Sequence, residues 1–161
     1  MKDLDFALQL ADAADEISLA RFRALDLNIE TKPDRTPVTD ADRAVESKLR
    51  DLISQHRPQE SVIGEEFANS GSSDRVWIID PIDGTANYLR GVPVWASLIA
   101  LRVNGEIVTS VVSAPALGRR WWATKNEGAF TKDVDGSVRQ IQVSKIADLE
   151  HVSISFNSIR Q

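Results

Sequence analysis

The sequence predicts an α+β protein in which helices pack on a largely antiparallel sheet. Two long segments with helical periodicity occupy the first third of the chain, and the later apolar segments are short. Asn104-Gly105 lies between two of these short segments, which is a strong hairpin signal and favours antiparallel pairing. The 161 residues are enough for one compact domain with its own core.

The first helix is expected over residues 3–25. Four apolar residues recur at steps of three and four and share one face, while acidic residues occupy much of the other face. These four are Phe6, Leu10, Ala13 and Ile17. A short strand is expected over residues 28–31, and the prolines and polar residues that follow predict a loop over residues 32–37.

The second helix is expected to begin after Thr39 and to end before Pro58. Thr39 suits the N-cap, and Asp40 and Asp42 lie in the first turn, where the helix dipole favours carboxylates. The residues that then repeat with helical period are Val45, Leu49, Leu52 and His56.

Short apolar or alternating segments after Pro58 are expected to form strands. They cover residues 61–64, 76–79, 94–103, 107–114, 120–124, 139–143 and 152–156, with a loop at 69–74. We find no internal repeat and no low-complexity tract.

Composition excludes several functional classes. The chain has no cysteine and two histidines, so a disulfide framework, a thiolate nucleophile and a histidine-rich metal site are ruled out. Any metal must be held mainly by oxygen, which favours Mg²⁺, Mn²⁺ or Ca²⁺. The net charge of −5 argues against non-specific nucleic-acid binding. No signal peptide and no membrane-spanning run is found, so we expect a cytoplasmic protein that does not enter membranes.

The segment from Trp77 to Thr85, Trp-Ile-Ile-Asp-Pro-Ile-Asp-Gly-Thr, carries the strongest chemical signal. An apolar strand delivers Asp80, and Pro81 forbids simple continuation of the ladder, so that Asp83 can return beside Asp80. Two close carboxylates repel each other unless a cation lies between them. The segment can also be read as a strand followed by an ordinary acidic turn. Gly84 and a short helix starting at Thr85 would add an anion site next to the carboxylates.

Two weaker acidic segments precede this one. In Ile63-Gly64-Glu65-Glu66, neighbours on a strand point to opposite faces, so one glutamate alone would face a site; the alternative is an exposed acidic strand end. In Pro37-Val38-Thr39-Asp40-Ala41-Asp42, the residues cap the helix, and Asp42 can in addition present a carboxylate to a ligand.

Taken together and in this order, the three segments resemble the signatures of the inositol-monophosphatase-like phosphatases. The Trp77–Thr85 string is highly specific, whereas the other two are weak singly. The resemblance covers essentially the whole chain and implies the N-terminal part of a layered α/β sugar-phosphatase-type fold.

The resemblance also implies a role for each matched residue. Glu65, Asp80, Asp83 and the Ile82 carbonyl would bind Mg²⁺, for which Mn²⁺ is a substitute, and Glu66 would lie behind them. Asp42 and Thr85 would orient the attacking water, with Glu65 also counted in the catalytic set. The substrate phosphate would lie against Glu65, Ile82, Asp83 and the amides of Gly84 and Thr85. The implied reaction is in-line hydrolysis of a phosphate monoester, without a covalent phospho-enzyme.

Two further segments suggest a substrate. Residues 90–101 and 114–123 resemble the histidinol-phosphatase branch, which implies L-histidinol phosphate and a place in histidine biosynthesis. An inositol-1-monophosphatase or a related sugar or nucleotide phosphatase remains an alternative. The same segments are also plain sheet strands, with Trp121 or Trp122 in the core. Arg119-Arg120 beside these tryptophans could instead mark a nucleic-acid surface, which the acidic net charge disfavours.

The chain departs from the family pattern in two respects. Family members continue into a C-terminal α/β portion with a further ligand aspartate in a Trp-Asp motif, and none of the four tryptophans here precedes Asp. We therefore expect residues 1–161 to form the metal- and phosphate-binding domain without that portion. An inactive fragment that binds a cation or a partner is a third alternative. Ala86 departs from the Lys or Thr often found after Gly-Thr. A homodimer is expected from the resemblance alone.

Overall fold

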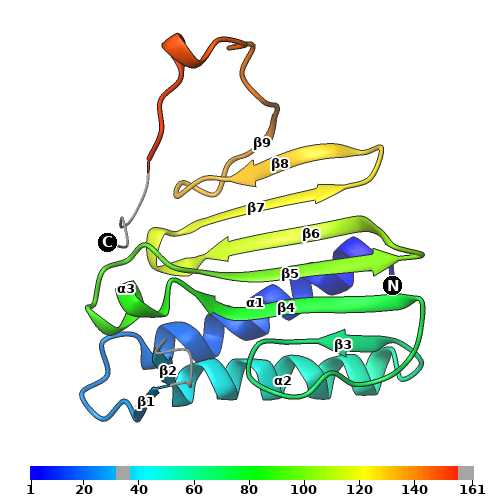
Figure 1. Ribbon diagram of the computed structural model, residues 1–161, viewed down its shortest axis with the longest axis vertical. Coiled ribbons are helices and arrows are strands. Elements are labelled where there is room, and N and C mark those ends of the chain that lie inside the picture. Colours follow the sequence, from blue (N-terminus) through cyan, green and yellow to red (C-terminus); the bar gives the residue numbers. More distant parts are fainter. Residues whose placement is uncertain (32–36, 156–161) are drawn as a thin grey trace.

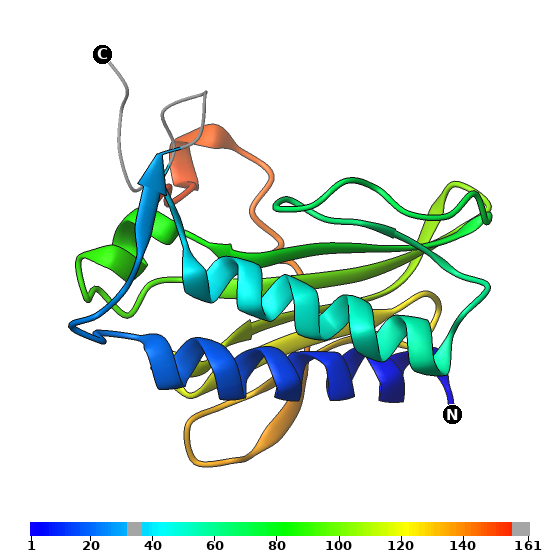
Figure 2. The same ribbon diagram turned by 90° about the horizontal axis from the view of Figure 1, so that it is seen from below.

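A seven-stranded mixed sheet forms the centre of the protein, and two long helices cover one of its faces. The computed structural model describes residues 1–31 and 37–155. The strand order is β3-β4-β5-β6-β7-β8-β9, in which the β3–β4 pair is parallel and every other pair is antiparallel. Helices α1 and α2 lie side by side beneath the sheet (Figures 1 and 2). The predicted α+β class with helices on a largely antiparallel sheet is confirmed.

The element bounds are as follows. The helices are α1 (Asp3–Arg21), α2 (Asp40–His56) and α3 (Thr85–Leu89), with short 3₁₀ turns at Pro115–Leu117 and Leu149–His151. A separate two-stranded ribbon pairs β1 (Ile29–Thr31) with β2 (Pro37–Thr39). The strands of the main sheet are β3 (Ser61–Ile63), β4 (Arg75–Asp83), β5 (Ala96–Val103), β6 (Glu106–Ala114), β7 (Arg119–Thr124), β8 (Gly128–Lys132) and β9 (Val138–Ile141).

Helix α1 is shorter than the sequence predicts. It ends at Arg21 because Phe22 adopts extended backbone angles and Arg23 is left-handed, with φ of 63°. The expected apolar face is shifted as well: Ala13 and Ile17 lie at the rim of the core. The fully buried residues of α1 are Phe6, Ala7, Leu10, Ala11, Ala14 and Ser18.

Helix α2 begins where the sequence predicts. The Thr39 side chain accepts a hydrogen bond from the Asp42 amide, and the Asp42 carboxylate accepts one from the Thr39 amide, which makes a capping box. His56 ends the helix but is exposed, contrary to its expected place on the apolar stripe. The predicted loop at 32–37 lies outside the described residues except for Pro37, which opens strand β2.

The strand predictions after Pro58 are mostly right, with three differences. Strand β8 was missed, because Gly-Ala-Phe-Thr-Lys is short and carries a weak alternation pattern. Residues 152–155 form no strand, and the segment after β9 leaves the sheet, as the orange and red ribbon shows (Figure 1). Strand β4 runs on to Asp83, four residues beyond expectation. The hairpin at Asn104-Gly105 is confirmed, with φ of 51° and 87°.

The register places neighbouring residues of each strand on opposite faces. Ile79, Ile99, Val111 and Trp122 form one cross-strand row. These residues belong to the core between the sheet and the helices, at whose margin Trp122 is partly buried. The adjacent row faces the other way and consists of Asp80, Leu98, Val112 and Trp121. Of the two candidate core tryptophans, Trp122 therefore packs toward the helices and Trp121 lies on the face of Asp80.

Candidate active site

A bulge in β4 presents the Asp80–Asp83 segment. Asp80 pairs with Leu98 and Asp83 pairs with Ala96, so the two residues between them on β4 are out of register with β5. The irregularity occurs at Pro81, which has no N–H for the ladder. The Ser97 hydroxyl donates a hydrogen bond of 2.6 Å to the Pro81 carbonyl and fixes the bulge from the neighbouring strand.

The carboxylate of Asp80 lies in a strongly negative environment. Burial is the main cause that raises its pKa to about 7, and the charges of Glu65, Asp83 and Asp42 raise it further. Glu65 is also within hydrogen-bonding reach of the Asp80 side chain. One Asp80 oxygen, Oδ1, is buried without a hydrogen-bond partner among the residues described. Each of the three acidic segments of the sequence thus places a carboxylate near enough to act on the pKa of Asp80.

Thr85 connects the helix-capping segment to the bulge. Its hydroxyl is 3.0 Å from the Ile82 carbonyl and 3.4 Å from Asp42 Oδ1, and it can donate to either. The other Asp42 oxygen accepts bonds from the Thr39 amide at 2.9 Å and the Thr39 hydroxyl at 2.6 Å. Burial raises the pKa of Asp42, although these hydrogen bonds partly oppose the rise. Capping and site formation thus use the two oxygens of one carboxylate.

Gly84 and the start of α3 follow the bulge directly. Gly84 has φ of 88°, a left-handed conformation that glycine adopts without strain, and α3 begins at Thr85 as expected. A side chain at Gly84 would approach the Val94 carbonyl to 3.2 Å. The buried Tyr88 holds α3 against α1 because its hydroxyl donates to the Ser18 carbonyl at 2.8 Å. Its ring packs edge-on against Trp95, with centroids 4.9 Å apart.

Glu65 and Glu66 lie in a bend after β3. The rule that neighbours on a strand point to opposite faces does not apply to them, because β3 ends at Ile63. The amides of both glutamates instead donate to the carboxylate of Glu46, at 3.0 Å and 2.7 Å. Glu46 was not predicted from the sequence. The signal was present: Asp42, Glu46, Leu49 and Ile53 share the buried face of α2.

A cavity of about 390 Å³ opens beside Asp83 and Gly84. The rest of its lining comes mainly from the two segments whose sequences resemble the histidinol-phosphatase branch. Residues 90–101 contribute Val94, Trp95 and Ala96, and residues 114–123 contribute Ala114, Leu117 and Trp121. Asn87 completes the lining and donates from its side chain to the Val94 carbonyl at 2.8 Å. The cavity is thus acidic at one end and largely apolar elsewhere.

The donor set suits a hard cation, although the side chains are not gathered into a coordination sphere. Within residues 1–31 and 37–155, no three histidine or acidic side chains stand close enough together to hold a metal ion as they are placed. The carboxylates are nevertheless near enough to raise the pKa of Asp80, and its buried Oδ1 has no described partner. Oxygen ligands of this kind fit Mg²⁺ or Mn²⁺.

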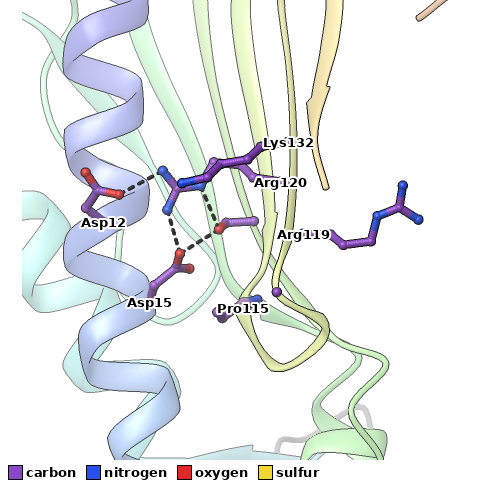
Figure 3. Close-up of a pocket in the computed structure, with 8 residues that line it drawn as sticks. Asp12, Asp15, Pro115, Arg119, Arg120 and Lys132 are labelled. Atoms are coloured by element: carbon purple, nitrogen blue, oxygen red, sulfur yellow. Dashed lines mark hydrogen bonds and ion pairs between the residues drawn. The ribbon is translucent and has the colours of Figure 1, made fainter. Parts of the chain in front are cut away.

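A second cavity, of about 240 Å³, lies between α1 and the β6–β7 edge. Arg120 reaches across it from β7 and donates to Asp12 at 2.8 Å and Asp15 at 2.6 Å on α1 (Figure 3). Arg119 points elsewhere and pairs with Asp133. Both guanidinium groups are therefore paired with carboxylates of the same chain.

A family model described as "Inositol monophosphatase family" matches residues 2–159. The chain belongs to the inositol monophosphatase family. The resemblance drawn from the three acidic segments is thereby confirmed. Among solved structures of this family, an IMPase from Thermotoga maritima is 35% identical and superposes with a TM-score of 0.83 over 93% of this chain and 57% of that one.

Curated relatives are more similar in sequence. A histidinol-phosphatase of Mycobacterium tuberculosis is 57% identical over 98% of this chain, and one of Streptomyces coelicolor is 52% identical over 99%. The chain spans 61% of the length of each of these relatives. In the part of the chain that the structure describes, no helix is long and apolar enough to cross a membrane.

Proposed function

We propose that this chain supplies the metal- and phosphate-binding part of a Mg²⁺-dependent phosphomonoesterase that acts on L-histidinol phosphate. The observation that carries the proposal is the half-buried Asp80 carboxylate, which lies near three other carboxylates beside the start of α3. Such an arrangement repels itself at neutral pH, and a divalent cation relieves that repulsion. Residues 1–161 are proposed to form one domain for this purpose.

The cation would be held by Glu65, Asp80, Asp83 and the Ile82 carbonyl. When bound, it lowers the pKa of a water molecule and neutralises charge on the phosphate oxygens. Mn²⁺ would substitute because it accepts the same oxygen ligands.

The protein groups beside the cation would orient the water and the phosphate. Asp42 Oδ1 and the Thr85 hydroxyl lie 3.4 Å apart, so a water near both would be held by two groups whose own positions are fixed. Asp42 is fixed by the capping box, and Thr85 by the Ile82 carbonyl. The amides of Gly84 and Thr85, at the beginning of α3, would hold the phosphate.

The cavity lining supports the choice of substrate. Histidinol phosphate has an amine and an imidazole, which the aromatic rings of Trp95 and Trp121 in the cavity wall suit. Inositol is a neutral polyol that would need polar partners along the same walls. The similarity to two proteins named histidinol-phosphatase points in the same direction.

Phosphate release from L-histidinol phosphate and from inositol 1-phosphate, each with Mg²⁺ and with EDTA, tests the proposal. We expect release that needs Mg²⁺ and is faster with histidinol phosphate. Equal release in EDTA would rule out the metal mechanism, and preference for inositol 1-phosphate would favour the inositol phosphatase alternative. Mg²⁺ binding in a calorimeter without any turnover would identify a non-catalytic cation-binding unit. The homodimer and the cytoplasmic location stay predictions, of which light scattering tests the first.

A further inference from the structure

Glu46 is a buried carboxylate with no part in the proposed chemistry. Its side chain is fully buried on α2, on the same face as the apolar Leu49 and Ile53. A charged group in such a place is strongly unfavourable unless it is paired and hydrogen-bonded. The partners of Glu46 therefore indicate what it does.

Four donors converge on this carboxylate. Oε2 accepts from the amides of Glu65 at 3.0 Å and Glu66 at 2.7 Å, and Oε1 accepts from the Phe67 amide at 3.2 Å and from Arg50 Nε at 2.8 Å. Hydrogen bonds to a charged acceptor are stronger than neutral ones. Three consecutive amides of the bend after β3 are thus directed at a single side chain.

Arg50 completes the arrangement from the next turn of α2. Besides pairing with Glu46, its guanidinium donates to the Phe67 carbonyl and to the Ser70 hydroxyl, each at 3.3 Å. The charge of Glu46 is neutralised by Arg50, so the pair does not add to the negative charge around Asp80. Glu46 accepts from the amides of residues 65–67, and Arg50 donates to Phe67 and Ser70, so that the pair holds residues 65–70 against α2.

Gly64 leaves the space that this contact requires. A Cβ at position 64 would lie 2.0 Å from Glu46 Oε1, although the backbone of Gly64 is not left-handed and would accept alanine. The Glu46 carboxylate cannot move away easily, because it is buried and held by four donors. The contact between Gly64 and Glu46 is therefore close enough to exclude any side chain.

We propose that Glu46 is a positioning residue that orders the bend at residues 64–67 and thereby aims the Glu65 carboxylate at Asp80. This inference rests on the proposed metal site, for which it names a supporting residue outside the ligand set. Residues that orient metal ligands typically change metal affinity about 10–100-fold when they are mutated.

The test combines amide hydrogen exchange with Mn²⁺ affinity in this chain. In Glu46→Gln the side chain keeps its size, but one oxygen becomes an NH₂ group that cannot accept from a backbone amide. We expect exchange of the peptide covering residues 64–67 to become at least about 10-fold faster and Mn²⁺ to bind about 10-fold more weakly. Ile53→Val is the matched control, because Ile53 is buried on the same helix face and carries no polar group. It should leave both readouts unchanged.

Gly64→Ala disturbs the same contact by placing a Cβ against the Glu46 carboxylate, and it changes no charge. It should reproduce both effects, and it tests the proposal if Glu46→Gln does not fold. Unchanged exchange at 64–67 in a folded variant would overturn the proposal, as would faster exchange with unchanged Mn²⁺ affinity. If the unmutated chain binds no Mn²⁺, the proposed function itself fails, and the role of Glu46 fails with it.

Discussion

Replacing Asp80 by Asn should stabilise the chain when no metal is present. The pKa of Asp80 is raised from 3.8 to about 7, chiefly by burial and by the charge of Glu65. At about 1.4 kcal/mol per pKa unit, such a rise corresponds to about 4 kcal/mol of destabilisation of the charged form. Because the side chain is only partly buried, solvent screens part of this repulsion, and we expect about 2 kcal/mol.

The effect must depend on pH with a definite sign. The folded state holds the Asp80 proton more tightly than the unfolded state, so the free energy of unfolding falls as the pH rises from about 4 to about 7. Asp80→Asn removes this dependence. The variant should be about 2 kcal/mol more stable than the unmutated chain at pH 8 and nearly equal to it at pH 4.

Urea denaturation in EDTA at both pH values measures the difference, and added Mn²⁺ provides the contrast. A bound cation raises the free energy of unfolding in proportion to the logarithm of its concentration over its Kd. Mn²⁺ should therefore stabilise the unmutated chain and have a much smaller effect on Asp80→Asn. A variant that is less stable than the unmutated chain at pH 8 in EDTA would refute the reasoning.

Three further substitutions test other parts of the structure. Asp83→Asn should reduce phosphate release about 100-fold or more while the free energy of unfolding changes by less than about 0.5 kcal/mol, because Asp83 is exposed. Tyr88→Phe removes the 2.8 Å bond to the Ser18 carbonyl and should lower the free energy of unfolding by about 1–2 kcal/mol in urea; no change would show that this bond does not anchor α3. Arg120→Met leaves Asp15, whose pKa burial already raises, without its cation. It should cost about 3 kcal/mol at pH 7 and less at acidic pH, because the raised pKa of Asp15 lets the carboxylate take up a proton more readily there, and an equal loss at both pH values would contradict this assignment.

Local signals account for the elements that were predicted correctly. The capping box at Thr39 and Asp42 and the hairpin at Asn104-Gly105 depend on residues within a few positions of one another. Strand β8 and the missing strand at 152–155 could not be predicted in the same way, because a short strand depends on a distant partner. Strand β8 has β7 and β9 on its two sides, and residues 152–155 are not placed against the sheet.

The candidate site likewise has parts that local sequence predicts and parts that depend on distant contacts. The segment from Asp80 to Thr85 can be recognised from its residues alone, and the turn at Gly84 can be predicted from the residues next to it in sequence. The role of Glu46 depends on amides 19 to 21 positions further along the chain. Only the packing of α2 against the bend after β3 brings these groups together.

The amino-acid order alone determined the family, because its signature is a run of consecutive residues, and it favoured oxygen ligands for any metal, because cysteine is absent and histidine is scarce. The residues proposed to hold the metal follow from the resemblance to that family. The tertiary structure decided which groups face one another: Asp42 with Thr85, Trp121 on the face of Asp80, and a buried glutamate behind Glu65. The reason is physical. Burial and charge proximity set the pKa of Asp80 and the need for partners at Glu46, and both arise only when distant segments pack together.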